Sequence, residues 1–533
     1  MREKADGNGL RGDFMQTVKA KKKYTLFTGK QLLWLIAPIV IENIFSTSLG
    51  MFDGIMVSSI DSLGHASNAV GNVDYINNLV IQLFSAFATG GTIITSQYLG
   101  ARNIDDAKKS AKHMLVIVLL FSVIIAGLCL ALNPYILQLF YPDVESDVME
   151  LQRTYFYITA ASFPLIGIFN GSAALLRAQR KSLVTMTSAG ISCVVNIGLN
   201  AAFIWGLDMG VAGAALATLI ARAIPAVYMR VLLMSDKNTL TVKLFTKFRF
   251  EARMVRRILF IAIPSGIESC LFQLGKLMTN TFVNAGCYQV FDEVSGKYVN
   301  IQANANTIAN SLNNIASMVG GGIGTSALTV IGQAVGTGDE GCVRYYIKRM
   351  FAISFIANAI AVAIIMGTSH WLIYLWEYPD AAYPVALRCL YFCLSFQFIT
   401  YPLSFTTPGI LKATSDVKYV MWAAISSMII VRVGLCFLFT DDALSGWLND
   451  VFGIKFEFGA MGYWIGMCSD WVVRSILFVS RLLTGRWKKA SGLIAEDAGD
   501  RMSASAQKQS IKRGKKIEYL PYINRRAKKF AGK

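Results

Sequence analysis

Residues 67–79 read SNAVGNVDYINNL, and residues 303–315 read ANANTIANSLNNI. Both stretches have asparagine at the second position and a pair of consecutive asparagines near the end, with apolar residues at similar places between them. Two stretches so far apart in one chain would not share this order by chance. The similarity therefore indicates that the second half of the chain repeats the first.

Further matches follow in the same order in both halves. They pair Pro38 and Glu42 with Pro264 and Glu268, Gln97 and Gly100 with Gln333 and Gly336, Pro164 with Pro402, and Gly210 with Gly459. The repeat thus covers most of the chain.

The composition is that of a membrane protein that crosses the bilayer many times. Hydrophobic residues make up 54% of the chain and charged residues 16%, and the mean hydropathy is +0.47. Apolar stretches of about 20 residues are long enough to cross a bilayer as helices. We predict twelve: Leu32–Val57, Ala69–Gln97, Met114–Leu132, Tyr155–Leu176, Val184–Trp205, Val211–Leu233, Ile258–Val283, Ala303–Ala334, Phe351–Ile373, Val385–Leu411, Tyr419–Phe439 and Ala460–Leu483.

The repeat and the spans together predict an all-α fold with two six-helix lobes. Because each half holds an even number of spans, both halves enter the membrane from the same side, so a pseudo-two-fold axis along the membrane normal relates them. Two such lobes leave a cleft between them that rocking exposes to each side in turn. The architecture favours a secondary transporter.

The net charge of +18 follows the positive-inside rule and does not call for a nucleic acid partner. Lys and Arg gather in alternate connections, which places both termini in the cytoplasm of a cell-membrane protein. The predicted parts are a cytoplasmic tail (1–31), an N-lobe (32–235), a cytoplasmic linker (236–257), a C-lobe (258–484) and a basic, disordered tail (485–533).

Motifs for nucleotide binding or hydrolysis are lacking. GTGDEG (336–341) has the GxGxxG spacing, but it follows a membrane span and its repeat partner GARNID (100–105) lacks the glycines. The sequence contains no Walker A, HExxH or GxSxG motif, and its nine cysteines form no CxxC pair. We therefore expect a protein that is not an enzyme and needs no cofactor.

Five segments in order resemble the multidrug and toxic compound extrusion (MATE) transporters. They are LGMFDGIMVSS (49–59), SQYLGARNIDDA (96–107), NIGLNAAFIWG (196–206), GVAGAALAT (210–218) and GQAVGTGDEG (332–341). The resemblance runs from about Leu32 to Leu483. It implies an antiporter that expels organic, often cationic amphipathic compounds in exchange for Na+ or H+.

The resemblance also implies a coupling-ion site in the first lobe, formed by Asp53, Asn196, Asn200 and Thr218. Asn196 and Asn200 lie four residues apart, so they share a helix face. Part of the family has aspartate where this chain has Asn200, which leaves Asp53 as the only carboxylate of the site. An acid in the bilayer is costly and marks an ion or proton pathway. One carboxylate with amide and hydroxyl oxygens suits Na+, and protonation is the alternative.

The second half has lost these groups. By the repeat register Arg432 and Cys436 stand where Asn196 and Asn200 do. Because an arginine repels cations, the ion site is expected in the first lobe alone.

Other polar residues within the spans are candidates for the cleft wall: Glu42, Asp74, Glu268, Lys276, Asn310 and Asn314. Glu42 and Glu268 have a structural role as an equal alternative. Lys276 either pairs with Glu268 or selects anionic or zwitterionic substrates. Asp470 and Arg474, four residues apart, are expected to neutralise each other.

Two other functions stay open: a flippase for a lipid-linked precursor in the same wider fold group, and a non-transporting membrane receptor or scaffold. A strongly cationic cleft and extra spans would favour the flippase. The expected partners of a transporter are a small organic substrate, a coupling cation and the bilayer, and the protein is expected to act as a monomer.

Overall fold

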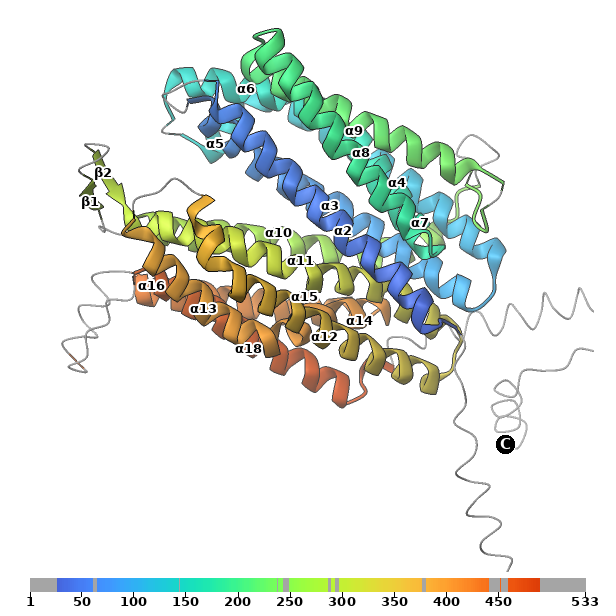
Figure 1. Ribbon diagram of the computed structural model, residues 1–533. Helices are drawn as coiled ribbons and strands as arrows, with labels where there is room; N and C mark the ends of the chain where they lie inside the picture. Colours follow the sequence, from blue (N-terminus) through green and yellow to red (C-terminus); the bar gives the residue numbers. More distant parts are fainter. Residues whose placement is uncertain are drawn as a thin grey trace, which may run out of the picture.

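The computed structural model describes residues 26–60, 65–142, 144–236, 238–242, 249–285, 289–292, 297–375, 380–440, 451 and 459–488. The predicted terminal tails lie almost entirely outside these residues, and the predicted linker lies partly outside them. The described chain forms two bundles of long helices, shown in Figure 1 in blue to green and in yellow to red.

The N-lobe contains the first six spans. Its elements are α2 (Gly29–Ser58), α3 (His65–Gly100), α4 (Ile104–Ala131), α5 (Asn133–Phe140), α6 (Ser146–Ala161), α7 (Phe163–Ala178), α8 (Ser182–Asn200), the π-helical turn η1 (Ala201–Gly206) and α9 (Gly210–Met234).

The C-lobe repeats this order. Its helices are α10 (Ala252–Ala285), α11 (Ile301–Gly336), α12 (Glu340–Leu372), η2 (Ile373–Leu375), α13 (Ala382–Tyr401), η3 (Pro402–Thr406), α14 (Thr407–Ala413), α15 (Val417–Ser426), η4 (Ser427–Val433), α16 (Gly434–Thr440) and α18 (Ala460–Leu483).

One element departs from the predicted all-α fold. Strands β1 (Gln289–Asp292) and β2 (Lys297–Asn300) pair antiparallel between α10 and α11, with Val290 opposite Val299. Each strand has one valine and one aromatic residue, Phe291 in β1 and Tyr298 in β2, and these residue types favour strands. The hairpin extends a connection and leaves the two-lobed helical architecture intact.

The predicted spans are present as helices, with interruptions. Ten helices of the described residues are long and apolar enough to cross a membrane, and α6 with α7, bent by 44°, makes an eleventh span. The bend falls at Ser162, two residues before Pro164 in the first turn of α7. The twelfth, α18, has 24 residues and is less apolar because it carries Asp470 and Arg474.

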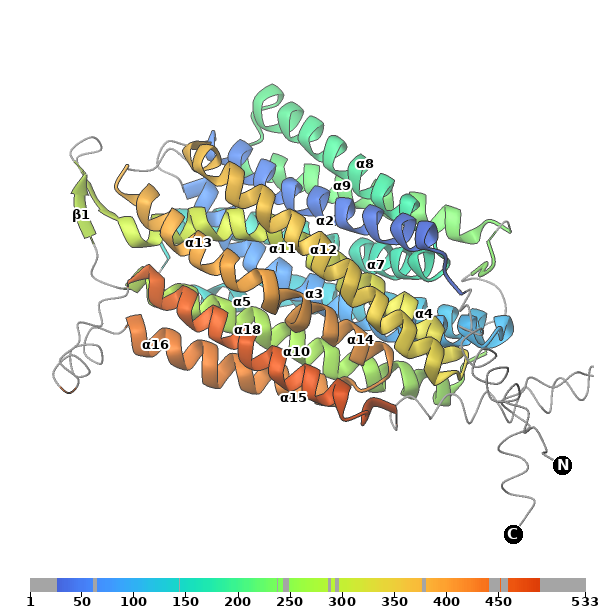
Figure 2. The ribbon, with the colours of Figure 1, turned by 60° about the horizontal axis from the view of Figure 1, so that its bottom comes forward.

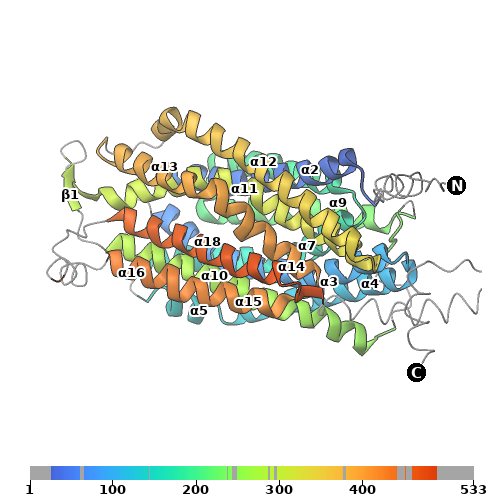
Figure 3. The same ribbon diagram turned by 90° about the horizontal axis from the view of Figure 1, so that it is seen from below.

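The described parts of the two lobes share hydrophobic cores at one end of the molecule. Near the start of α2 and the end of α18, one hydrophobic core joins α2 to α11 and α12, and another joins α3 and α4 to α10. Toward the β1–β2 hairpin each lobe has a core of its own. Figure 1 shows the two bundles diverging toward the hairpin, and Figures 2 and 3 show the hairpin at the opposite end from the C-terminal end of α18. We call the end near the start of α2 the closed end and the end near the hairpin the open end.

Reciprocal contacts between the repeats hold the closed end together. The Gln97 side chain donates to the carbonyl oxygen of Ala413 (2.9 Å), and the Gln333 side chain donates to that of Ala178 (2.8 Å). Two glycines, Gly100 and Gly336, let the α3 and α11 backbones touch there. These six residues are called the interlobe seal below.

Candidate functional site

The structure brings Asp53, Asn196, Asn200 and Thr218 together inside the N-lobe. Asn200 donates its side-chain N–H to the Asp53 carboxylate and lies 3.3 Å from Asn196 Oδ1, and Asn196 donates to Thr218 Oγ1 at 3.4 Å. All four are buried. The helices α2, α8 and α9 each contribute to this cluster, and the π-helical turn η1 begins directly after Asn200. The i, i+4 spacing on α8 places both amides against Asp53, as the sequence predicts.

The cluster offers oxygen atoms to a cation. Asn200 Oδ1 is buried and has no hydrogen-bond partner among the described residues. A buried acceptor without a donor is unfavourable unless a cation or proton satisfies it. With the Asp53 carboxylate, the Asn196 amide oxygen and the Thr218 hydroxyl, the cluster fits the donor set of a hard monovalent cation.

A cavity of about 280 Å³ adjoins the cluster and holds a second acid and an arginine. Asp53, Asp74, Thr218 and Arg222 are among its lining residues. Asp74 accepts a hydrogen bond from Asn77 (3.2 Å), and Arg222 donates to Ser162 (2.8 Å). The formal charges of Asp53, Asp74 and Arg222 sum to minus one. Because Asp74 lines this cavity, it lies beside the cluster in the N-lobe rather than in the cleft between the lobes.

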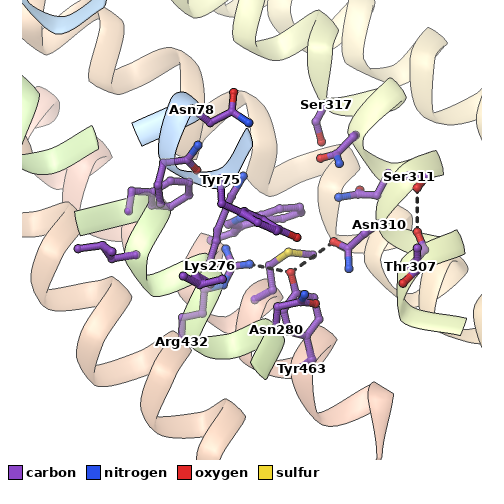
Figure 4. Close-up of a pocket in the computed structure, with 18 of the residues that line it drawn as sticks. Tyr75, Asn78, Lys276, Asn280, Thr307, Asn310, Ser311, Ser317, Arg432 and Tyr463 are labelled. Atoms are coloured by element: carbon purple, nitrogen blue, oxygen red, sulfur yellow. Dashed lines mark hydrogen bonds between the residues drawn. The ribbon is translucent and has the colours of Figure 1, made fainter. Parts of the chain in front are cut away.

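A second cavity, of about 390 Å³, lies between the lobes on the open-end side of the seal. The N-lobe contributes Tyr75, Asn78 and Leu79 of α3, and the C-lobe contributes residues of α10, α11, η4, α18 and the α13 region. Asn78 lines both cavities, so they adjoin across α3. Asn310 and Asn314 are on this wall, as predicted. Figure 4 shows Lys276, Arg432, Tyr463 and Asn310 pointing toward one another there.

The interlobe cavity is cationic. Lys276 and Arg432 line it, and the described residues that line it include no Asp or Glu. Arg432 donates to the Tyr463 hydroxyl (3.0 Å), which lies 3.3 Å from Asn310 Oδ1. This charge argues against the cationic substrate that the family resemblance implies.

The pairing of Lys276 with Glu268 is wrong. Glu268 forms its ion pair with Lys412 of α14 at 2.8 Å. The expected pair of Asp470 with Arg474 is confirmed at 3.3 Å. Among the described residues Lys276 has no carboxylate partner, and its ammonium lies 5.2 Å from the centre of the Phe272 ring.

Glu42 and Glu268 do not line either cavity. Glu42 accepts hydrogen bonds from Arg177 of α7 and from Thr185 of α8 (2.6 Å). Glu268 has the equivalent contact with Lys412, so each lobe holds one such pair near the closed end. Both glutamates thus have the ion-pair partners that the structural alternative expects.

Sequence reasoning did not identify three basic residues that contact or adjoin the candidate residues. Arg222 is an arginine within an apolar span, and this alone could have drawn attention to it. Arg177 and Lys412 belong to short basic connections that we attributed to membrane orientation. Their positions in the repeat, following Pro164 and Pro402, could have identified them as matched partners of the two glutamates.

Comparisons with known proteins agree with this architecture. The family model described as MatE matches residues 38–202 and 296–438. A probable multidrug resistance protein NorM of Thermotoga maritima is 24% identical over 488 residues, covering 88% of this chain and 95% of the relative. The structure of an outward-facing multidrug resistance MATE family transporter of the MOP superfamily superposes with a TM-score of 0.75 at 20% identity, covering 89% of this chain and 99% of the other.

A second solved structure is a MOP superfamily transporter from Pyrococcus furiosus, described as having a binding pocket of reverse polarity that suggests a different function. It also gives a TM-score of 0.75 at 20% identity, covering 88% of this chain and 99% of the other.

Proposed function

This chain belongs to the MATE family, whose members are transporters rather than enzymes, and we propose that it is an antiporter that exports an organic compound in exchange for Na+ or H+. The relative from Thermotoga maritima carries the name of a multidrug resistance protein, which supports export of foreign or toxic compounds. The interlobe cavity is the substrate site, and the buried cluster around Asp53 is the coupling-ion site.

The observation that carries the proposal is the state of Asp53. This carboxylate is 5% exposed and accepts a hydrogen bond from the Asn200 amide, and among the described residues no arginine or lysine lies at ion-pair distance from it. A buried carboxylate without a counter-charge is unfavourable, so the cluster gains stability when a cation or proton arrives. The cation would be held by Asp53, Asn196, Asn200 and Thr218.

Coupling follows from the position of the two cavities. Asn78 lies on both, so helix α3 separates the ion cluster from the substrate cavity. A change in the packing of α2 and α3 on ion binding therefore alters the substrate cavity directly. The same two helices form the N-lobe side of the lobe contact, which is why ion binding would shift the lobes.

Orientation supports an outward-open state. The positive-inside pattern assigns the closed end, where α2 begins, to the cytoplasm, so the cavity would face outward in the cell membrane. In this state the interlobe seal closes the cavity toward the cytoplasm, and the coupling ion enters from outside. Export then requires the seal to open and the open end to close.

The test is gradient-driven flux in proteoliposomes loaded with fluorescent dyes of either charge. Na+ and pH gradients are imposed separately on the wild type and on Asp53→Asn. Because Asp53 is the only acid of the cluster, we expect the variant to lose gradient-driven flux. Any dye movement that remains should be independent of the Na+ and pH gradients.

Asp208→Asn is the matched control. Asp208 is exposed and lies before α9 with a positive φ of 50°, a conformation that asparagine tolerates. This control should transport like the wild type. Undiminished gradient-driven flux in Asp53→Asn would refute the coupling role, and a protein that moves no dye under either gradient would contradict the antiporter.

A further inference from the structure

We propose that the interlobe cavity binds the negatively charged group of an amphipathic organic anion, such as a carboxylate, sulfonate or phosphate. This inference rests on the proposed transport function and specifies its substrate class. It reverses the charge that the family resemblance implies.

Three cationic side chains surround one aromatic ring, that of Phe272. Lys276 Nζ lies 5.2 Å, Arg432 Cζ 6.0 Å and Arg474 Cζ 4.8 Å from the centre of the Phe272 ring. An aromatic face attracts cations, but only weakly in comparison with a carboxylate. One ring cannot neutralise three positive charges.

Negative charge is scarce around this cluster of three cations. Asp470 is the only carboxylate bonded to this cluster among the described residues, and it already accepts hydrogen bonds from Arg474 and Ser427. Lys276 and Arg432 therefore remain as two uncompensated positive charges. The mutual repulsion of the two cations and the burial of Arg432 make this arrangement costly, so an anion that enters the cavity gains a favourable electrostatic interaction.

The charges of Lys276 and Arg432 are presented to the cavity. Lys276 is exposed on the cavity wall, while Arg432 is only 1% exposed and is held by Tyr463. Buried Arg432 Nε has no hydrogen-bond partner among the described residues. A flexible ammonium that is accessible from the cavity, beside a fixed and nearly buried guanidinium, attracts an oxyanion.

Other lining residues suit the rest of the ligand. Tyr75, Phe272, Tyr401, Phe405 and Trp471 also line the cavity and provide aromatic faces, while Asn280 and Asn314 provide amides. Aromatic faces beside convergent amides and cations fit an organic body that carries one charged group and other polar groups. A small inorganic anion would leave most of the 390 Å³ unused.

The opposite charges of the two cavities fit this assignment. Asp53 and Asp74 with Arg222 leave the N-lobe cavity negative, whereas Lys276 and Arg432 make the interlobe cavity positive. The coupling cation and an anionic substrate would therefore not compete for one site. The positive charge keeps Na+ in the N-lobe.

The test uses two probes that share a fluorophore and differ in charge: dansylglycine, a carboxylate, and dansylcadaverine, an ammonium. Binding to the purified protein is read from energy transfer from Trp471 and other tryptophans to the dansyl group. We expect dansylglycine to bind at least about 10-fold more tightly, because a charge-assisted contact typically contributes that much.

Three variants identify the source of the preference. Lys276→Met keeps the size of the side chain, and it should lose most of the preference for dansylglycine; Lys276→Arg should keep it. Lys418→Met is the matched control, since Lys418 also lies over an aromatic ring, Phe260, at 4.9 Å but outside the cavity. Equal or tighter binding of dansylcadaverine, no saturable binding of dansylglycine, or a preference unchanged in Lys276→Met would overturn the inference.

Competition distinguishes two sources of the anionic group. Stronger displacement by dihexanoyl phosphatidylglycerol than by naphthalene sulfonate assigns the group to a lipid, as in a flippase; the reverse order assigns it to a soluble organic anion. Either order supports an anion site. Flux separates this inference from the transport proposal: gradient-driven, Asp53-dependent export of dansylcadaverine alone would refute only the anion site, whereas anion-selective binding without gradient-driven flux would refute only the antiporter.

Discussion

The interlobe seal makes a sharp prediction for Gly336→Ala. A Cβ atom added at Gly336 would stand 1.9 Å from the carbonyl oxygen of Gln97, whereas real Cβ atoms essentially never come closer than 3.0 Å to another heavy atom. The obstacle is backbone, so no side-chain rotation can remove it. The ends of α3 and α11 must move apart by more than 1 Å, which strains the reciprocal bonds of Gln97 and Gln333.

Overpacking of this kind typically costs about 1 to 3 kcal/mol. The strain exists only while the lobes are in contact at the interlobe seal. The substitution should therefore raise the fraction of molecules in which the lobes have separated there by about 5- to 150-fold. Hydrogen exchange of the backbone amides in residues 97–103 and 411–416 measures that fraction. We expect faster exchange there, with little change in α6 or α13.

Gly367→Ala is the matched control, because a Cβ at Gly367 in α12 meets nothing within 4 Å. Alanine should be neutral or slightly stabilising there. Unchanged exchange at the closed end in Gly336→Ala, or an equal change in Gly367→Ala, would refute the view that tight glycine contacts hold this end shut.

Three further predictions concern the closed end. Glu42→Gln leaves Arg177 without its carboxylate and should lower the free energy of unfolding by about 3 kcal/mol, toward the lower limit for a buried pair; thermal unfolding measures the loss, and the double variant with Arg177→Met should recover part of it, whereas additive losses would contradict the pairing. Tyr346→Phe removes a hydroxyl that accepts from the Phe27 N–H (2.7 Å) and donates to its carbonyl oxygen (3.1 Å), so it should cost about 1 to 3 kcal/mol and speed proteolysis before α2; wild-type proteolysis would contradict it. Gln333→Leu removes the bond to Ala178 and should speed exchange at residues 176–181 by several-fold, for about 1 kcal/mol, while unchanged exchange would show that this bond does not help to hold the seal.

The sequence carries the fold because the repeat and the membrane restrict the choices. Twelve apolar stretches of bilayer length leave little freedom in element type, and an even number per half fixes the relation of the lobes. The helix interruptions at Ser162 and Pro402 follow from repeat-matched prolines. The β1–β2 hairpin was missed because it lies in a connection, where no bilayer constraint acts.

The candidate site divides into what local spacing can predict and what it cannot. Asn196 and Asn200 share a helix face, so their meeting at one point was predictable, and the family resemblance supplied Asp53 and Thr218. Partners across helices were not predictable. The sequence leaves open whether Lys276 pairs with Glu268, and only the structure shows that Lys412 of α14 takes that carboxylate. The free charge of Lys276, and with it the polarity of the cavity, follows from this packing.

The central claim is that the cluster around Asp53 binds the coupling cation, and ion-dependent stability tests it without any substrate. The thermal unfolding midpoint of the purified protein is measured in Na+ against choline, and at two pH values, for the wild type, Asp53→Asn and Asp208→Asn. Binding to the folded state alone adds about 2.7 kcal/mol at a hundred times the dissociation constant. We predict that Na+ or the change of pH shifts the midpoint of the wild type and of Asp208→Asn by more than that of Asp53→Asn, which keeps only the shift due to its other groups; equal shifts in all three proteins would contradict cation or proton binding by the cluster.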